Sequence, residues 1–316
     1  MKELLLALAL DWLAGDPPNR LHPVAWMGQG IVWAERHAPR RGPLAEFSYG
    51  LGLVLGGAVG IGSVGTFAPR ILAPFSLVDA WLLKCTFASK SLAAAAGEVQ
   101  QALEANDLDE ARRRVSWHLV SRDTSALSAE HIAAATIESV AENTSDGFVA
   151  PVFYYVLFGL PGALVYRFLN TADAMLGYHD EKHEWLGKAA ARLDDLANFI
   201  PARLTALLLL LAAWLKGEDA RREDAWREDA RRGWMIWRRD AARTASPNAG
   251  QPMSAMAGVL GVELEKQGVY RLGEGQRRPQ AADIARSVKL MRWAMGLMAI
   301  LATVFLFARS RRTARR

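Results

Sequence analysis

Long stretches without a charged side chain constrain the fold of this chain more than any other feature of its sequence. Residues 47–68 and 147–166 contain no Asp, Glu, Lys or Arg. Each is at least as long as the roughly 20 apolar residues that a helix needs to cross a bilayer core. Residues 293–308 are expected to cross as well, whereas residues 204–215 need extra length from residues 198–201 or are re-entrant. The sequence therefore predicts an all-α, polytopic integral membrane protein with polar helices at the membrane edge.

The overall composition alone does not indicate a membrane protein. Hydrophobic residues make up 51% of the chain and charged residues 22%, and such values are ordinary for soluble proteins. The single cysteine, Cys85, excludes an internal disulfide and a cysteine metal cluster, so we expect a buried free thiol. Residues 1–13 lack a small-residue cleavage site, and we expect them to be retained rather than removed as a signal peptide.

The excess of positive charge gathers at the C-terminal end. The net charge is +5, and a group of arginines directly follows the last apolar run: Arg309, Arg311, Arg312, Arg315 and Arg316. Such a group beside a span normally marks the cytoplasmic side and contacts anionic lipid. A nucleic-acid-binding tail is the rival interpretation, but the position against a span favours lipid. We expect the lipid bilayer as a partner and no nucleic acid.

Residues 120–146 hold the densest group of polar side chains and lie just before the second uncharged run. Glu138 and Glu142 are four positions apart and therefore share one face of the expected helix. Further polar side chains crowd both ends of the segment: Ser121, Arg122, Asp123 and Thr124, then Asn143, Thr144, Ser145 and Asp146. Few structural needs call for so many acceptors beside a membrane segment, and we interpret this segment as the chemical centre.

The N-terminal segment 11–28 contains three prolines, which prevent a continuous helix and predict a structured loop. Asp16, Arg20 and His22 are crowded into this loop. They either bind a ligand, as ionisable groups beside a membrane segment often do, or simply shape a turn. The pattern leaves both interpretations open.

Two polar stripes follow the second uncharged run. Their members have the i, i+3, i+6 spacing of one helical face: Arg167, Asn170 and Asp173, then Arg192, Asp195 and Asn198. Asp194 adds an i, i+4 pair with Asn198. The stripes either form a site or tie helices together through ion pairs, and the position of ionisable groups at the membrane edge favours a site.

Glycine and proline shape both long runs. Gly52, Gly56 and Gly60 give residues 47–68 a face of small residues, which predicts close helix packing in a membrane. Residues 147–166 are interrupted by Pro and Gly, which predicts a kinked or re-entrant helix that faces protein or a cavity.

Two polar segments lie between the last two uncharged runs. Residues 216–243 repeat Glu-Asp-Ala with a period of five, which gives no single helical face and predicts a solvated, salt-bridged helix. Residues 244–258 are small and polar. A loop there, with Ser246 and Asn248, can hold a phosphate through backbone N–H groups, but the pattern alone favours a plain linker. We expect residues 1–316 to form one membrane-embedded domain, with 216–243 and 309–316 as peripheral parts.

The common catalytic motifs are absent. The sequence contains no P-loop, no nucleophile elbow and no zinc-protease His-Glu-x-x-His motif. Carboxylates and arginines remain, and these suit Mg²⁺ and phosphate groups. The residues therefore indicate a membrane enzyme that acts on a phosphorylated or nucleotide substrate.

Four stretches closely resemble the adenosylcobinamide-phosphate synthase family of cobalamin biosynthesis, often called CobD/CbiB. They are DWLAGDPPNRLHPVAWMG (residues 11–28), the whole of residues 120–178, ARLDDLANFIPARLTA (191–206) and ASPNAGQPMSAMAG (245–258). The resemblance covers nearly the whole chain. It implies an all-helical membrane enzyme that joins adenosylcobyric acid to aminopropanol phosphate, or to aminopropanol, through an amide. It also implies ATP and Mg²⁺ as cofactors, a corrinoid substrate and an activated acyl intermediate.

On this resemblance we base the expected roles of the polar side chains. Mg²⁺ would be held by a set drawn from Glu138, Glu142, Asp146 and Asp173. The candidates for proton transfer and catalysis are Asp123, Glu142 and Asp195. The other candidates would bind substrate or phosphate groups: Asp16, Arg20, His22, Arg122, Thr124, Asn143, Arg167, Asn170, Arg192, Asn198, Arg203, Ser246 and Asn248.

Two other functions stay open. A distant relative of the family is a membrane sensor in β-lactamase regulation, which makes a non-catalytic role the first alternative. A small-molecule transporter is the second, although the inverted repeats expected of many transporters are not found. We expect a multi-pass protein of the cell membrane, the inner membrane in a bacterium, with other membrane enzymes of cobalamin assembly as further partners.

Overall fold

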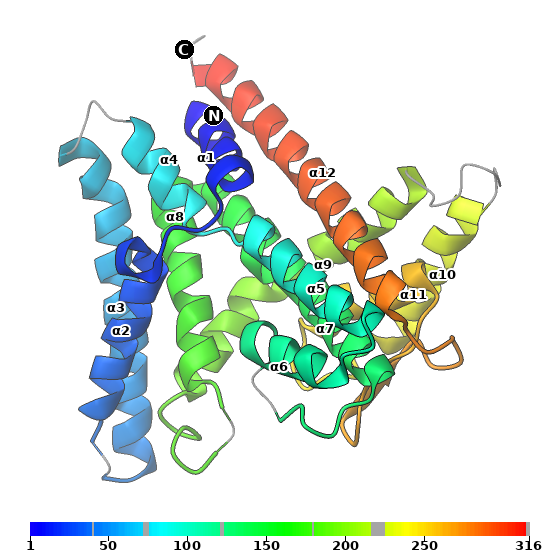
Figure 1. Ribbon diagram of the computed structural model, residues 1–316. Coiled ribbons are helices and arrows are strands. Elements are labelled where there is room, and N and C mark those ends of the chain that lie inside the picture. The colour runs from blue at the N-terminus through cyan, green and yellow to red at the C-terminus, as the bar shows by residue number, and fades with distance from the viewer. Residues whose placement is uncertain (40, 72–75, 121–122, 179, 216–224, 314–316) are drawn as a thin grey trace. The chain divides into compact units, whose positions relative to one another are not determined.

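The computed structural model describes residues 1–39, 41–71, 76–120, 123–178, 180–215 and 225–313 (Figure 1). The described residues are mainly helical, as predicted. The elements are α1 (Lys2–Ala14), η1 (Asn19–Leu21), α2 (Pro23–Arg36), α3 (Pro43–Ile71), α4 (Ser76–Lys84), α5 (Ser89–Glu104), α6 (Leu108–His118), α7 (Ala129–Thr144), the π-helical turn η2 (Ser145–Val149), α8 (Ala150–Leu176), α9 (Lys188–Leu215), α10 (Ala225–Asp240), α11 (Gly250–Leu260), β1 (Leu264–Lys266), β2 (Tyr270–Leu272) and α12 (Ala281–Thr313).

Four helical stretches among the described residues are long and apolar enough to cross a membrane: Pro43–Ala68, Ala129–Leu176, Lys188–Leu215 and Ala281–Arg312. They contain all four uncharged runs of the sequence, so the prediction of a polytopic helical membrane protein is confirmed. Because α9 begins at Lys188, it supplies the length that residues 204–215 lack by themselves.

The chain divides into two compact units, which are described separately below. Unit 1 comprises Met1–Ala88, Ala150–Asn198 and Leu301–Arg316, and unit 2 comprises Ser89–Val149 and Phe199–Ile300. The helices α9 and α12 each contribute to both units. The expectation of one domain with peripheral parts stays a prediction.

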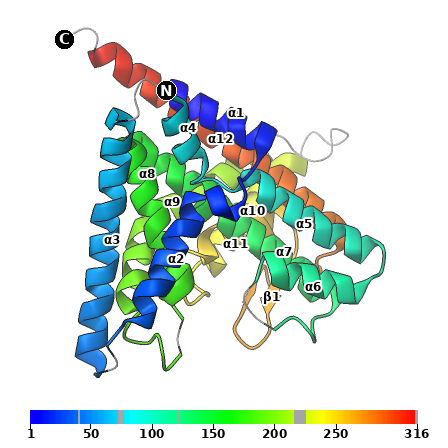
Figure 2. The same cartoon turned by 60° about the vertical axis from the view of Figure 1, so that its left-hand side comes forward.

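In unit 1, α3 packs along α8 (Figures 1 and 2). The glycines that permit the close approach are not the predicted ones. A Cβ on Gly65 would lie 2.8 Å from the Cα of Pro161, but none on Gly52, Gly56 or Gly60 would meet an atom within 4 Å. The packing prediction was wrong for these three glycines, because their side of α3 faces open space rather than α8.

Glycine and proline also shape two other helices of unit 1, α8 and α2. In α8, Gly159 adopts a φ of 71° just before Pro161 and kinks the helix, as the sequence predicted for residues 147–166. Pro23, in contrast, lies at the first position of α2, where its missing N–H is tolerated. The predicted loop 11–28 is therefore shorter than expected, since α1 reaches Ala14 and α2 begins at Pro23.

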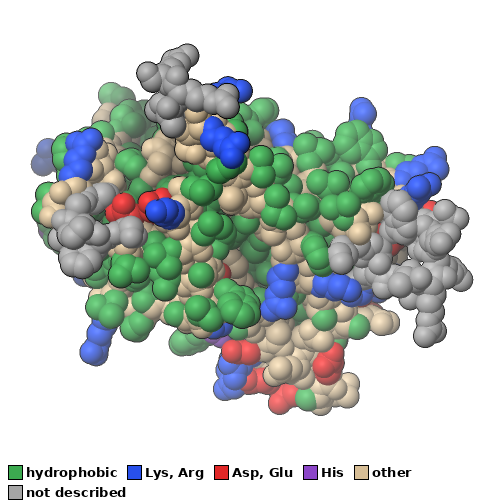
Figure 3. All heavy atoms as spheres, turned by 90° about the horizontal axis from the view of Figure 1, so that it is seen from above, with side chains coloured by type: hydrophobic (Ala, Val, Ile, Leu, Met, Phe, Trp, Pro, Cys, Tyr) green, Lys and Arg blue, Asp and Glu red, His purple; other side chains and the backbone are tan. Residues whose placement is uncertain are grey.

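Large hydrophobic side chains are exposed along α3 and the C-terminal part of α12, including Val59, Val64, Phe67, Val304 and Phe305. Figure 3 shows hydrophobic side chains over much of the face that it presents. An apolar surface of this kind is suited to lipid rather than to water, in agreement with the candidate spans.

In unit 2, the buried helix α11 packs against α10 and α7. A Cβ on Gly258 of α11 would lie 2.7 Å from the Cα of Gly233 of α10, so the two backbones meet directly. Gly233, Ile236 and Asp240 are buried on one face of α10. The prediction of a solvated helix within residues 216–243 was therefore wrong for this face of α10. The prediction of a linker for residues 244–258 was also wrong from Gly250 onward, where α11 begins.

Candidate active site

Helix α7 carries the two glutamates that the sequence singled out. Ser128 caps the helix by accepting a hydrogen bond from the His131 N–H at 3.4 Å, and the following alanine-rich stretch favours helix formation. Most of α7 is buried within unit 2. Glu138 is itself buried and Glu142 is half-buried one turn further on, so both carboxylates lie on one face of an otherwise enclosed helix.

A short hairpin supplies the opposite wall. Strands β1 and β2 pair antiparallel with Lys266 opposite Tyr270, and the turn between them uses Gly268 with a φ of +71°. Because side chains alternate along a strand, Lys266 and Tyr270 share the hairpin face that also carries the fully buried Leu264 and Leu272. The hairpin therefore presents an ammonium and a phenol toward the interior of unit 2.

These two walls enclose a cavity of about 180 Å³. Its lining combines two carboxylates, a hydroxyl, an ammonium and a phenol with apolar side chains: Leu119, Val120, Ala135, Glu138, Ser139, Glu142, Met253, Lys266 and Tyr270. The sequence analysis found the glutamates but missed Lys266 and Tyr270. The sequence around them does predict a β-hairpin, because Lys266 and Tyr270 flank a glycine-containing turn at the spacing of a cross-strand pair.

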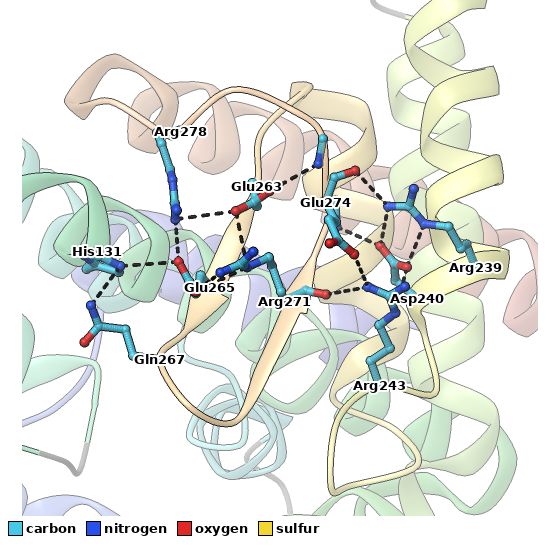
Figure 4. A network of polar contacts seen from close by, with 12 residues as sticks. His131, Arg239, Asp240, Arg243, Glu263, Glu265, Gln267, Arg271, Glu274 and Arg278 are labelled. Carbon is cyan, nitrogen blue, oxygen red and sulfur yellow. Dashed lines mark hydrogen bonds and ion pairs between the residues drawn. The ribbon is translucent and has the colours of Figure 1, made fainter.

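An ion-pair network holds the outer face of the hairpin (Figure 4). Glu265 accepts hydrogen bonds from Arg278 at 2.5 Å and from Arg271 at 2.6 Å. These two guanidinium groups lower the pKa of Glu265 to about 2. Glu265 also lies 3.6 Å from His131 Nε2, at the beginning of α7. The network therefore links the hairpin to the helix that bears the glutamates.

Asp240, at the end of α10, also holds the hairpin in place. Arg239 donates two hydrogen bonds of 2.8 Å to its carboxylate, and the Gly273 N–H donates a third of 2.8 Å. Burial acts to raise the pKa of Asp240, but these hydrogen bonds and the nearby Arg243 outweigh it and the pKa lies below its ordinary value. Asp240 thus fixes the residues after β2 to α10.

The other predicted residues of the 120–146 segment have local contacts. The Asp123 carboxylate accepts hydrogen bonds from the Ser125 N–H at 2.9 Å and the Ser125 hydroxyl at 3.0 Å, which lower its pKa. Thr124 donates to the Arg112 carbonyl at 3.0 Å. Asn143 donates to the Ser139 carbonyl, also at 3.0 Å. Such contacts suit a turn and a helix end, and they do not favour Asp123 as a base.

Two members of that segment remain. Asp146 is half-buried in the π-helical turn η2. Arg122 lies outside the described residues. The predicted roles of both stay predictions.

In unit 1, the polar stripes of α8 and α9 meet at Asp194. Its carboxylate accepts hydrogen bonds from Asn198 at 2.9 Å and from Asn170 at 3.4 Å. Arg167 in turn donates to Asn170 at 3.3 Å, and Tyr166 donates to Asn198 at 2.8 Å. The structure thus brings together Arg167, Asn170 and Asn198, with Asp194 as the shared acceptor.

The remaining stripe residues differ in exposure. Arg192 is exposed, and Asp195 and Asp173 are half-buried on α9 and α8. Sequence spacing placed Asp195 on the stripe, but the buried acceptor is its neighbour Asp194, because the i, i+4 relation to Asn198 governs the contact.

The N-terminal candidates are held by structural contacts. Asp16 pairs with Lys84, whose buried ammonium also lies 3.2 Å from Asp11. His22 caps α2 by accepting a hydrogen bond from the Val24 N–H at 3.2 Å. The Arg20 carbonyl accepts one from Trp26. These contacts favour the interpretation in which the loop shapes the fold. The nearby Cys85 is a buried free thiol, as predicted, and burial raises its pKa to about 12.

The loop before α11 joins the last three candidates. Arg203 donates to the Asn248 side chain at 3.2 Å, and the Ser246 hydroxyl accepts from the Asn248 N–H, also at 3.2 Å. These bonds fold residues 244–249 into a tight turn that leads into the buried helix α11. Their predicted role in phosphate binding stays a prediction.

The donor set of the cavity fits a magnesium ion. Among the described residues, no group of three or more His, Cys, Asp and Glu side chains converges to bind a metal. Mg²⁺ is, however, usually held by one or two carboxylates together with substrate phosphates and water. Glu138 and Glu142 provide two carboxylates in one cavity. Asp173, also predicted as a ligand, belongs to unit 1.

Comparison with known proteins identifies the family. The CobD/Cbib protein family model matches residues 4–291. The chain belongs to the CobD/CbiB family. A probable cobalamin biosynthesis protein CobD of Methanothermobacter thermautotrophicus is 42% identical over 286 residues, covering 86% of each chain. The cobalamin biosynthesis protein CobD of Dehalococcoides mccartyi is 41% identical, covering 91% of each.

A third CobD/CbiB relative, the cobalamin biosynthesis protein CbiB of Salmonella typhimurium, is 38% identical over 311 residues, covering 93% of each chain. No solved structure matches the chain. The family prediction made from the four sequence stretches is confirmed, and it covers both units.

Proposed function

We propose that this protein is an adenosylcobinamide-phosphate synthase, which forms an amide between adenosylcobyric acid and aminopropanol phosphate in an ATP-dependent reaction. The observation that carries the proposal is the cavity in which Glu138 and Glu142 face Lys266 and Tyr270. Amide formation from a carboxylate and an amine needs a base for the ammonium proton and positive charge beside phosphate groups. This cavity offers both, in a chain whose relatives are named cobalamin biosynthesis proteins.

Each polar wall of the cavity has a distinct task. Glu142, the less buried glutamate, takes the proton from the ammonium group of the aminopropanol substrate. The amine nitrogen then forms the C–N bond with the activated carboxyl carbon, and the phosphate group that came from ATP leaves as its C–O bond breaks. Lys266 binds a phosphate group of the substrate or of ATP, as lysines commonly do in phosphate sites. Tyr270 donates a hydrogen bond that orients the same group.

Glu138 is the residue that would hold Mg²⁺, together with substrate phosphates and water, while the Glu142 carboxylate acts as the base. When bound, Mg²⁺ and ATP supply charge neutralisation and activation of the carboxyl group. Burial of Glu138 within unit 2 keeps its carboxylate fixed, because a buried and packed side chain loses its alternative rotamers on folding. The polar cluster around Asp194 is assigned to substrate binding, together with Arg167, Asn170 and Asn198.

The site belongs to a protein of the cell membrane. We assign the reaction to the cytoplasmic side, where ATP is present, and to the inner membrane when the host is a bacterium. Other membrane enzymes of cobalamin assembly are the proposed partners, since the corrinoid product passes to them.

The proposal is tested with the purified full chain in detergent or nanodiscs. Adenosylcobyric acid, aminopropanol phosphate, ATP and Mg²⁺ are incubated with the protein, and adenosylcobinamide phosphate is quantified by mass spectrometry. Product that forms only when ATP is present supports the synthase. Absence of product, together with uptake of a corrinoid into sealed vesicles, would instead support the transporter alternative.

A further inference from the structure

A second polar hollow in unit 2 lies between α5 and α12. Its volume is about 320 Å³, and its lining is Ala93, Gly97 and Gln100 from α5 with Ala285, Val288, Lys289, Arg292 and Trp293 from α12. None of these residues belongs to the cavity of the glutamates. The small side chains of α5 leave the space open, since a Cβ on Gly97 would meet no atom within 4 Å.

Two cations border this hollow. Lys289 and Arg292 are three positions apart on one face of α12 and both are exposed. Neither side chain forms an ion pair or a hydrogen bond with another of the described residues. Most arginines near the hairpin, in contrast, are paired: Arg239, Arg243, Arg271, Arg277 and Arg278 all contact carboxylates. The hollow between α5 and α12 thus combines uncompensated positive charge with room for a ligand.

The position along α12 points to the kind of anion. Trp293, at the edge of the hollow, is the first residue of the uncharged run 293–308, and it is 39% exposed. A tryptophan at the beginning of a span and cations just before it are typical of the level of the lipid headgroups. Basic pockets beside membrane helices bind the headgroups of anionic lipids.

We propose that the hollow formed by Gly97, Gln100, Lys289, Arg292 and Trp293 binds the phosphate headgroup of an anionic membrane phospholipid. The Arg292 guanidinium and the Lys289 ammonium bind the phosphodiester oxygens. Gln100 donates a hydrogen bond from the α5 side, and Trp293 lies where the headgroup meets the acyl chains. A soluble phosphate would use the same cations, but it would not need a site at the beginning of a span.

The test measures the melting temperature of the detergent-solubilised full chain during titration with short-chain lipids. Dioctanoyl phosphatidylglycerol is compared with dioctanoyl phosphatidylcholine, inorganic phosphate and ATP. The proposal predicts saturable stabilisation by phosphatidylglycerol that phosphatidylcholine does not reproduce. Equal effects of the two lipids would overturn it. Equal or tighter binding of inorganic phosphate or ATP at this hollow would overturn the assignment to a lipid.

Three variants locate the site. The double variant Lys289→Gln/Arg292→Gln is expected to weaken phosphatidylglycerol binding about thirtyfold, or about fivefold for each basic residue. Gly97→Leu fills the hollow without a change of charge and is expected to weaken binding by at least tenfold, or about one decade of affinity. Arg231→Gln/Arg238→Gln removes the same charge from exposed positions of α10 and should bind like the wild type. Wild-type binding by Gly97→Leu, or equal losses in both double variants, would overturn the proposal.

Discussion

Lys266 on β1 and Tyr270 on β2 are cross-strand partners, and both line the cavity that Glu138 and Glu142 enter from α7. The hairpin is small, but its register determines which side chains face the glutamates. A shift by one residue would turn Glu265 inward and place a like charge beside the two glutamates. The ion pairs of Glu265 with Arg271 and Arg278 oppose such a shift, because they need those side chains on the outer face.

Replacement of Lys266 tests the hairpin wall. In Lys266→Gln, we expect kcat/KM for amide formation to fall about a hundredfold, since the reacting phosphate groups lose a positive partner. Lys266→Arg should recover part of this loss because it keeps the charge. Steady-state kinetics with varied ATP and aminopropanol phosphate provide the measurement. Unchanged kinetics in Lys266→Gln would remove the hairpin from the site.

Acid stability tests the outer network. Glu265 has a pKa of about 2 in the folded protein, whereas an ordinary glutamate in the unfolded chain titrates near 4.3. The ionised Glu265 therefore stabilises the folded state at pH values above about 4.3. This contribution is lost as the pH falls from about 4.3 toward 2. When the pH is lowered from 6 to 3, the melting temperature of Glu265→Gln should fall less than that of the wild type. Glu130→Gln, an exposed substitution on α7, serves as the control, and an identical pH dependence in all three proteins would contradict the prediction.

Two glycines of α3 distinguish close packing from open space. Gly65→Ala should destabilise the protein by about 1–3 kcal/mol, because the new Cβ overlaps the backbone of Pro161. Gly60→Ala on the same helix meets nothing and should be neutral or stabilise slightly. Melting temperatures in one detergent provide the comparison. Equal effects of the two substitutions would mean that α3 does not pack on α8 through this face.

The contact of Asp16 with Lys84 separates a structural role from substrate binding. Asp16→Asn should lower the free energy of unfolding by about 1–3 kcal/mol, because a charged hydrogen bond to a buried ammonium is weakened. Its KM values should stay at the wild-type level. Asp109→Asn, which changes a carboxylate that is 94% exposed, should alter stability by less than about 0.5 kcal/mol. A raised KM without loss of stability would instead return Asp16 to the substrate site.

The sequence predicted the features that depend on local pattern. Uncharged runs gave the candidate spans, the four-residue spacing placed Glu138 and Glu142 on one face, and Gly159 with Pro161 gave the kink in α8. Each of these follows from the helical period or from the backbone chemistry of a single residue, without knowledge of the neighbouring helices.

Features that depend on tertiary neighbours were missed. The glycine stripe of α3 was expected to pack, but spacing cannot tell which side of a helix meets its partner. The spacing gave the pair of Asp194 with Asn198 but not the hydrogen bond of Asp194 with Asn170, which comes from a second helix. The hairpin itself has a local signal, but Lys266 was overlooked because its place beside the glutamates depends on the contact of β1 with α7, which lies far from it along the chain.

The most direct test of the account is the rate of amide formation by Glu142→Gln. The substitution keeps the shape of the side chain but removes the carboxylate that we propose as the base, and Glu130→Gln makes the same change at an exposed position of α7. With all proteins at equal folded concentration, we expect Glu142→Gln to lose at least a hundredfold in kcat, while Glu130→Gln retains the wild-type rate. Full activity in Glu142→Gln would contradict the assignment of the reaction to this cavity.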